Sequence, residues 1–149
     1  MGVHDRGLGA AWWALRTALG LGVFLAGLDK FFNLLTDWTM YLSSAASGVL
    51  PVAAPVFMRA AGVVEMAVGL AILTRWTRAG AYIAMVWLGG IIANLVASGM
   101  FFDLAVRDLE IAVAMFALAR LTEWRAGEAA LERAVRGRPP ELERLDARA

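Results

Sequence analysis

Long apolar segments recur along the chain and are separated by short polar stretches. The segment from Ala79 to Phe102 contains no charged residue and is long enough to cross the ~30 Å hydrocarbon core of a bilayer as a helix. The segments 12–35, 56–73 and 104–121 are also long enough, although each carries a few charged side chains. Because the uncharged segment already indicates a membrane protein, we interpret these three segments as further spans of a bundle, with their charged side chains facing protein instead of lipid. The pattern therefore predicts an all-α, integral membrane four-helix bundle.

A shorter helix is expected between the first two spans, over residues 36–48. Thr36 and Asp37 are good residues for capping the start of a helix. Trp38 and Tyr41 follow at helical spacing, and tryptophan and tyrosine are enriched where a membrane meets water. We therefore expect an interfacial helix between spans one and two, with both aromatic rings as anchors.

The distribution of arginine predicts the orientation of the chain. Residues 123–149 are rich in arginine, and arginines also occur in the connection between the second and third predicted spans. The connections 36–55 and 99–103 contain neither lysine nor arginine. Because cytoplasmic segments carry the excess of these residues, both termini are expected in the cytoplasm. The chain then divides into a four-helix transmembrane domain, 1–122, and a charged cytoplasmic tail, 123–149.

The composition supports a membrane protein and argues against several kinds of chemistry. Hydrophobic residues make up 60% of the 149 residues and charged residues 18%, whereas soluble domains average about 45–50% apolar and about 25% charged residues. A small soluble domain buries too little of its surface to hide so much apolar area. The sequence has no cysteine, and His4 is its only histidine. We therefore expect no metal site and no intrinsic cofactor. We expect the chain to be in contact with a lipid bilayer and not to bind nucleic acid.

The spans carry faces of small residues interrupted by polar ones. On the first span this face is formed by Arg16, Gly20, Gly27 and Lys30. On the second span it is formed by Gly62, Glu65 and Gly69. Residues with this spacing share one side of a helix. Glycines on such a face allow a neighbouring backbone to come close, so we expect these spans to pack through them.

The predicted orientation places most polar residues of the spans in the outer half of the membrane. A charge at the bilayer centre costs at least ~2.5–3.5 kcal/mol, so these groups should pair with one another or meet water. Paired charges that only lock the helices together are one interpretation, and a ligand pocket open to the periplasm is the other. In the second interpretation, the residues that bind a ligand or handle protons are Asp29, Lys30, Arg59, Glu65, Asn94, Arg107 and Asp108. The pattern identifies no catalytic residue.

Several short motifs resemble those of the DoxX family of small four-helix membrane proteins. In chain order they are residues 24–33 (FLAGLDKFFN), 62–65 (GVVE) with Gly69, Thr74 and Arg75 with Arg78, and Arg107 with Asp108. The resemblance covers about residues 15–120. It implies a four-helix bundle in the cytoplasmic (inner) membrane of a prokaryote.

The resemblance also implies a link to redox chemistry. Some DoxX relatives are subunits of a thiosulfate:quinone oxidoreductase, and others are linked to redox or stress complexes. In a quinone-linked role the cations Lys30, Arg59 and Arg107 would hold an anion, and Glu65 or Asp29 would move protons. Since the sequence offers no cysteine and no set of cofactor ligands, electrons would come from a partner protein, and any catalysis would depend on that partner.

Three functions remain open from the sequence. The first is an accessory or quinone-linked subunit of a membrane redox system, working with a partner. The second is a non-enzymatic scaffold or assembly factor that binds other membrane proteins or further copies of the chain. The third is a small transporter that uses the charged pocket, although four helices without an internal repeat disfavour a monomeric one. The sequence does not specify the substrate, the partner or the oligomeric state.

Overall fold

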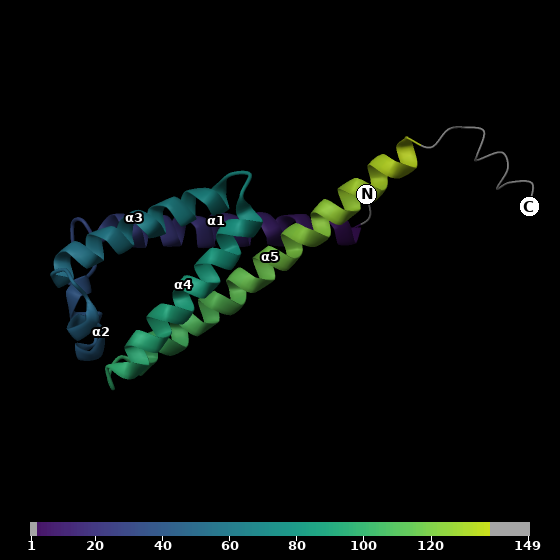
Figure 1. Cartoon of the computed structure of the whole chain (residues 1–149). Helices are drawn as coiled ribbons and strands as arrows, with labels where there is room; N and C mark the ends of the chain where they lie inside the picture. Colours follow the sequence, from purple (N-terminus) through teal and green to yellow (C-terminus); the bar gives the residue numbers. More distant parts are fainter. Residues whose placement is uncertain (1–2, 138–149) are drawn as a thin grey trace, which may run out of the picture.

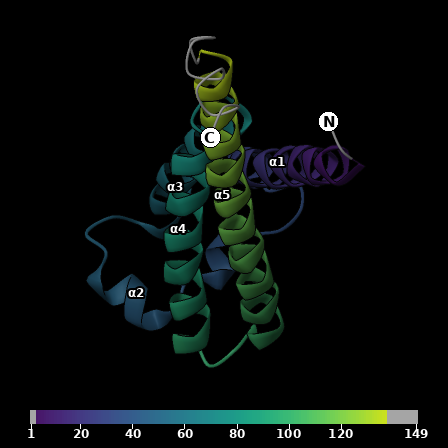
Figure 2. The same ribbon diagram turned by 90° about the vertical axis from the view of Figure 1, so that its right-hand side faces the viewer.

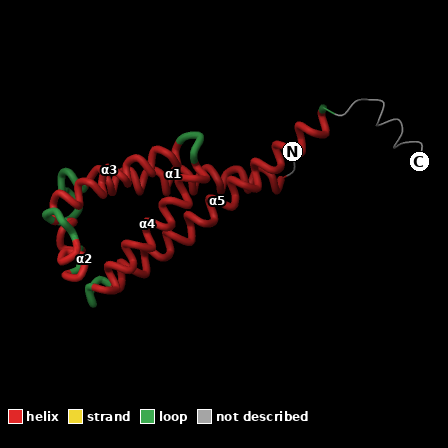
Figure 3. Tube along the Cα trace, viewed as in Figure 1, coloured by secondary structure: helices red, strands yellow, loops and turns green. Residues whose placement is uncertain are grey.

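The computed structural model describes residues 3–137, which are helical apart from short connections (Figure 3). In chain order the elements are α1 (Val3–Asp29), the 3-10 helix η1 (Trp38–Tyr41), α2 (Ser44–Val49), α3 (Ala54–Leu73), α4 (Thr77–Ala97) and α5 (Phe102–Arg136). No strand occurs in this part of the chain. Three helices, α1, α3 and α4, are long and apolar enough to cross a membrane. The structure is therefore that of an all-α protein compatible with a multi-pass membrane topology.

The fourth predicted span, residues 104–121, lies in the first half of α5. It carries several charged side chains and does not reach the apolarity of α1, α3 and α4. Four membrane crossings therefore stay a prediction. The helix continues unbroken to Arg136, so the predicted boundary between residues 122 and 123 falls within one helix. Residues 138–149 of the predicted tail lie outside the described residues.

The long helices form two hairpins, one from α1 and α3 and one from α4 and α5. The hairpins are joined by the short connection between α3 and α4, and they diverge from it toward α2 and the α4–α5 turn (Figures 1 and 2). The apolar core lies at the junction, where Ile72, Met115 and Leu118 are fully buried and Trp12 is buried beside them. The connection end of the molecule is therefore where both hairpins are packed together.

The α1–α3 hairpin is packed through glycines. A Cβ atom added at Gly27 would lie 2.6 Å from the Gly62 carbonyl oxygen, and one added at Gly69 would lie 2.7 Å from the Phe24 nitrogen. Only residues without a side chain permit backbones to come this close. The predicted packing of the first two spans through Gly20, Gly27, Gly62 and Gly69 is therefore confirmed.

The segment between α1 and α3 differs from the single helix predicted over 36–48. It contains η1 and α2, which are separated by Leu42 and Ser43 in extended conformation. Asp37 caps η1 as predicted, and hydrogen bonds from the Thr39 hydroxyl and backbone N–H lower the pKa of its carboxyl below the usual range. The location of this segment in a membrane interface stays a prediction.

The first span ends at Asp29, earlier than the predicted end at residue 35. The Asp29 carboxylate accepts hydrogen bonds from the backbone N–H groups of Leu34 and Leu35 and from the Trp38 indole. Asn33 has a positive φ of 50°, a conformation that asparagine tolerates better than most residues. These contacts replace a further helical turn, so Asp29 closes the turn that follows α1.

The helix α4 ends at Ala97, whereas the uncharged segment continues to residue 102. Gly99 and Phe101 have positive φ angles of 70° and 61°, and the chain reverses there before α5 begins. Glycine adopts such angles without steric cost. The uncharged segment 79–102 therefore predicted the presence of this helix, but not the residue at which it ends.

Candidate functional site

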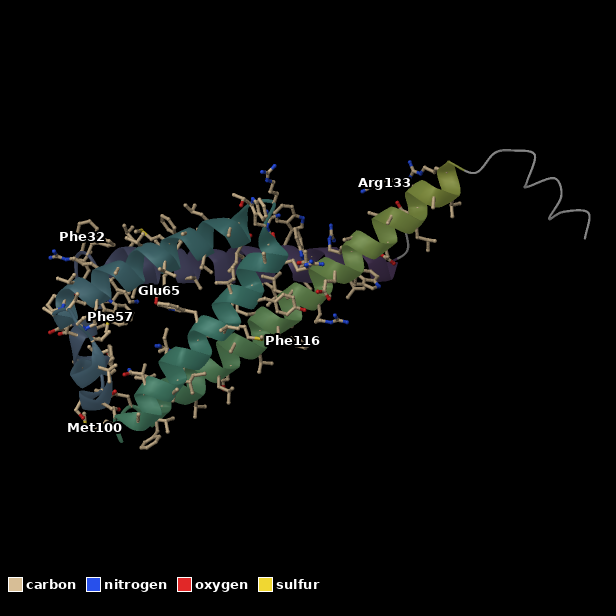
Figure 4. The ribbon with its side chains drawn as sticks, in the orientation of Figure 1. Phe32, Phe57, Glu65, Met100, Phe116 and Arg133 are labelled. Carbon is tan, nitrogen blue, oxygen red and sulfur yellow. The ribbon has the colours of Figure 1, made fainter. Side chains whose placement is uncertain are left out.

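A buried ion pair between the end of α1 and the middle of α3 forms the centre of the candidate site. Lys30 Nζ lies 2.6 Å from Glu65 Oε2, and each side chain is only 7% exposed. The pair forms because Gly27 and Gly62 bring the two backbones together one helical turn away. Glu65 lies on the side of α3 that faces α4 (Figure 4). Glu65 is thus buried on the face on which its spacing from Gly62 and Gly69 placed it, and its charge is paired with that of Lys30.

Two tryptophans complete the surroundings of this ion pair. Trp87 of α4 donates its indole Nε1–H to Glu65 Oε1 over 3.2 Å. Lys30 Nζ lies 3.8 Å from the centroid of a Trp38 ring, a distance at which a cation is attracted to an aromatic face. The site therefore joins α1, η1, α3 and α4. Trp87 was not among the predicted site residues, although its spacing places it on the same face of this span as Asn94, two helical turns away.

A pocket of about 440 Å³ lies beside Trp87. It is lined by Tyr82, Ile83, Val86, Trp87 and Gly90, which all belong to α4. The lining is almost entirely apolar, and the hollow is open toward the outside of α4 and not enclosed by a second helix. Trp87 is thus shared by an apolar pocket and a buried ion pair.

Asn94 and Asp29 do not contact the ion pair, but they hold the segment between α1 and α3 that carries Trp38. Asn94 Nδ2 donates to the Tyr41 carbonyl oxygen over 2.7 Å, and its Oδ1 accepts from the Ser43 N–H at 3.0 Å. A continuous helix would need these two backbone groups for itself, so the helix is interrupted between η1 and α2. The Asp29 carboxylate accepts the Trp38 indole N–H at 2.8 Å, which holds that ring beside the lysine.

The structure does not bring the other predicted site residues to the ion pair. Arg107 and Asp108 pair with each other on α5 at 3.1 Å, with side chains 58% and 8% exposed. Arg59 is exposed on α3. No hydrogen bond or salt bridge within residues 7–137 joins these three residues to Lys30 or Glu65. The seven predicted residues therefore belong to separate groups, and only Lys30 and Glu65 are in direct contact across helices.

Arg16 is bound to the end of α3. Its Nε donates to the Ile72 carbonyl oxygen at 3.0 Å, and its Nη2 donates to those of Leu73 and Thr74 at 2.7 and 2.6 Å. The last carbonyl groups of a helix have no partner within the helix, and a positive charge is favourable beside them. Arg16 thus caps α3 from the neighbouring helix and fixes one end of the hairpin.

The fold and these contacts define a class: an all-helical protein with candidate membrane-spanning helices and a buried ion pair between two of them. Comparisons of the chain with models of protein families, with curated proteins and with solved structures find no significant match. The DoxX resemblance is therefore neither supported nor refuted by them and stays a prediction. Within the described residues, no cluster of three or more His, Cys, Asp or Glu side chains is arranged to hold a metal ion.

Proposed function

We propose that the chain is a DoxX-like protein of a prokaryotic inner membrane and an accessory, quinone-linked subunit of a membrane redox system. The observation that carries this proposal is the buried Lys30–Glu65 pair, which Trp87 connects to the apolar pocket on α4. Quinones with isoprenoid tails are dissolved in the bilayer, and a pocket on a candidate span is reached directly from that phase.

A quinone head group fits the chemistry of these residues. Its carbonyl oxygens accept hydrogen bonds, and the Lys30 ammonium has three N–H groups, of which one is donated to Glu65 Oε2 and one to the Ala26 carbonyl oxygen at 3.5 Å. One N–H group remains for the head group. Its flat ring stacks on an indole such as that of Trp87. The apolar lining of the pocket suits the ring edge or the tail.

The redox step needs a partner. Reduction of a quinone to a quinol adds two electrons and two protons, and this sequence has no cysteine and a single histidine. The electrons are therefore assigned to a partner redox protein. Glu65 is the carboxylate nearest to the proposed head-group position, so it is the group assigned to proton transfer.

The test is quinone binding by the purified protein. A short-chain quinone is titrated into the detergent-solubilised chain, and quenching of tryptophan fluorescence is followed. We expect saturable quenching for the unmodified chain. The double variant Lys30→Met/Glu65→Leu removes both charges without leaving either one buried alone, and it should lose this quenching.

The matched control for this titration is Trp76→Phe. It removes an exposed tryptophan from the α3–α4 connection, away from the ion pair, and should leave saturable quenching intact. If the unmodified chain and Lys30→Met/Glu65→Leu give the same titration curve, the quinone proposal is refuted.

The alternative function is a non-enzymatic scaffold or assembly factor that binds other membrane proteins. It is favoured by the divergence of the two hairpins (Figure 1), together with exposed apolar side chains such as Val86 and Val113, which are 71% and 61% exposed. Surfaces of this kind contact lipid or a partner. Cross-linking in the membrane followed by purification discriminates the two functions, because a stoichiometric protein partner without bound quinone supports the scaffold.

A further inference from the structure

A second pocket, of about 410 Å³, lies at the connection between α3 and α4, toward the other end of these helices from the Lys30–Glu65 pair. Its lining includes Arg16, Arg75, Arg78, Trp12, Trp76 and Thr122. The pocket is thus bordered by α1, by the connection, by the start of α4 and by α5. It adjoins the buried core that holds the two hairpins together.

The lining of this pocket is positively charged. Arg16, Arg75 and Arg78 contribute to it, and no aspartate or glutamate does. Within residues 7–137, neither Arg75 nor Arg78 forms a salt bridge. Arg16 uses Nε and Nη2 on the end of α3, and among the described residues its Nη1 group has no hydrogen-bond partner. A cavity with these donors and no carboxylate attracts an anion.

Aromatic rings accompany these arginines. Trp76 is 57% exposed, and the Arg75 guanidinium lies 5.3 Å from its ring. The guanidinium groups of Arg16 and Arg125 lie 4.8 Å and 4.7 Å from the centroid of the Trp12 ring. Tryptophan next to arginine is typical of the level of lipid head groups. The pocket is at that level if α3 and α4 span the membrane, because it lies at their adjoining ends.

We propose that this pocket binds the phosphate group of an anionic phospholipid. Arg16, held in place by the end of α3, forms the fixed side of the site, and Arg75 and Arg78 pair with the phosphate oxygens. Guanidinium groups bind phosphate with two parallel hydrogen bonds, and basic pockets between membrane helices bind anionic head groups. Free phosphate shares this chemistry, but the lipid is favoured because the acyl chains would lie along candidate spans. The bound lipid would tie the two hairpins together at their junction.

The test measures lipid binding to the full-length chain in detergent by native mass spectrometry. Phosphatidylglycerol and phosphatidylcholine with identical acyl chains are compared, and we expect preference for phosphatidylglycerol. Each arginine near an anionic surface contributes about a fivefold gain in affinity, so Arg75→Gln/Arg78→Gln should weaken phosphatidylglycerol binding about 25-fold. Phosphatidylcholine carries the same phosphate together with a choline cation that the arginines repel, so its weaker binding should fall much less.

The matched control is Arg133→Gln/Arg136→Gln, which removes the same charge from exposed positions at the end of α5. It should keep the preference. Equal losses in the two double variants would overturn the proposal, because charge alone and not the pocket would be responsible. Displacement of the lipid by inorganic phosphate at millimolar concentration would also overturn it and assign the pocket to a soluble anion.

A structural defect in the double variant is recognised separately. Circular dichroism and thermal unfolding without added lipid should match the unmodified chain, since Arg75 and Arg78 are exposed. Should the glutamine variant fail to fold, Arg75→Lys/Arg78→Lys provides the second measurement. It keeps the charge but loses bidentate phosphate binding, so the preference should fall partially. Unchanged preference in the lysine variant would contradict the proposed guanidinium contacts.

Discussion

Lys30 Nζ and Glu65 Oε2 lie 2.6 Å apart across the α1–α3 interface, and both side chains are 7% exposed. Removal of one member of a buried pair leaves the other charge uncompensated, which costs ~3–5 kcal/mol. We expect Glu65→Ala to lower the stability of the detergent-solubilised protein by about that amount. Asp103→Ala, which removes an exposed carboxylate from the first turn of α5, should have a small effect. Thermal unfolding followed by circular dichroism measures both.

The double variant Lys30→Met/Glu65→Leu separates charge compensation from packing. Apolar replacement of a whole buried pair is often neutral or stabilising, so this variant should be more stable than Glu65→Ala alone. Equal melting temperatures for Glu65→Ala and Asp103→Ala would show that Glu65 is accessible to water in solution.

Two glycines of the α1–α3 hairpin should respond to alanine with opposite signs. A Cβ atom at Gly62 would lie 2.5 Å from the Gly27 carbonyl oxygen, whereas one at Gly22 would meet nothing within 4 Å. Alanine is favoured over glycine in a helix by ~0.8–1 kcal/mol, so Gly22→Ala should raise thermal stability slightly. Gly62→Ala should lower it by ~1–3 kcal/mol, since overpacking forces the helices apart. A gain in both variants would disprove the close approach of α1 and α3.

The sequence made the α1–α3 interface predictable because helical periodicity determines which residues share a face. The spacing of Gly20 and Gly27, and of Gly62 and Gly69, identified the faces that meet. The same spacing placed Lys30 and Glu65 on those faces. The pairing itself was not predicted, because Arg59 and Arg107 were equally possible partners of Glu65, and the structure identifies Lys30.

The grouping of the remaining charges could not be predicted in this way. Arg107 and Asp108 lie on α5, in the other hairpin, and their distance from Lys30 depends on how the two hairpins diverge (Figure 2). That divergence is set where the hairpins pack, around Ile72 and Met115. Such packing depends on the shapes of several helices at once, and the period of a single helix contains no information about it.

Arg16 should stabilise the end of α3. Its guanidinium donates to three carbonyl oxygens there, of Ile72, Leu73 and Thr74, and each hydrogen bond with a charged group contributes ~1.5–3 kcal/mol. We expect Arg16→Met to lower the unfolding free energy by at least about 2 kcal/mol and to accelerate amide hydrogen exchange in the α3–α4 connection, measured without added lipid.

The control for this experiment is Arg59→Met. It removes a positive charge from an exposed position on α3. Within the described residues Arg59 forms no salt bridge. Destabilisation by Arg59→Met as large as that by Arg16→Met would mean that net charge, and not the capping of α3, determines the effect.

Asn94 should determine the break between η1 and α2. Its side chain holds the Tyr41 carbonyl and the Ser43 N–H, so Asn94→Leu releases both groups. We expect faster hydrogen exchange over residues 41–47, read by mass spectrometry of peptides from this segment. Ala93→Leu adds a similar side chain at the exposed neighbouring position of α4 and should leave the exchange unchanged. Equal exchange in both variants would show that the segment holds its conformation without Asn94.

The course of α5 decides whether the chain crosses the membrane four times. The helix packs against α4 as the second arm of a hairpin and buries Ala105, Met115 and Ala119 along its first half. If α4 spans the bilayer, we expect an antiparallel partner of this extent to span it as well. Four crossings also bring Arg75 and the arginine-rich chain end to the same side, which agrees with the excess of positive charge in cytoplasmic segments. Three crossings would place that end on the opposite side.

Reporter fusions test this topology. A fluorescent protein that matures only in the cytoplasm, fused after Ala149, should be active, and alkaline phosphatase at the same position should be inactive. Fusions truncated after Gly99, in the α4–α5 turn, should give the reverse result, because this turn carries no arginine or lysine and is expected on the periplasmic side. An active phosphatase after Ala149 together with a dark fluorescent fusion would show that α5 does not cross, and the four-helix transmembrane domain would then be wrong.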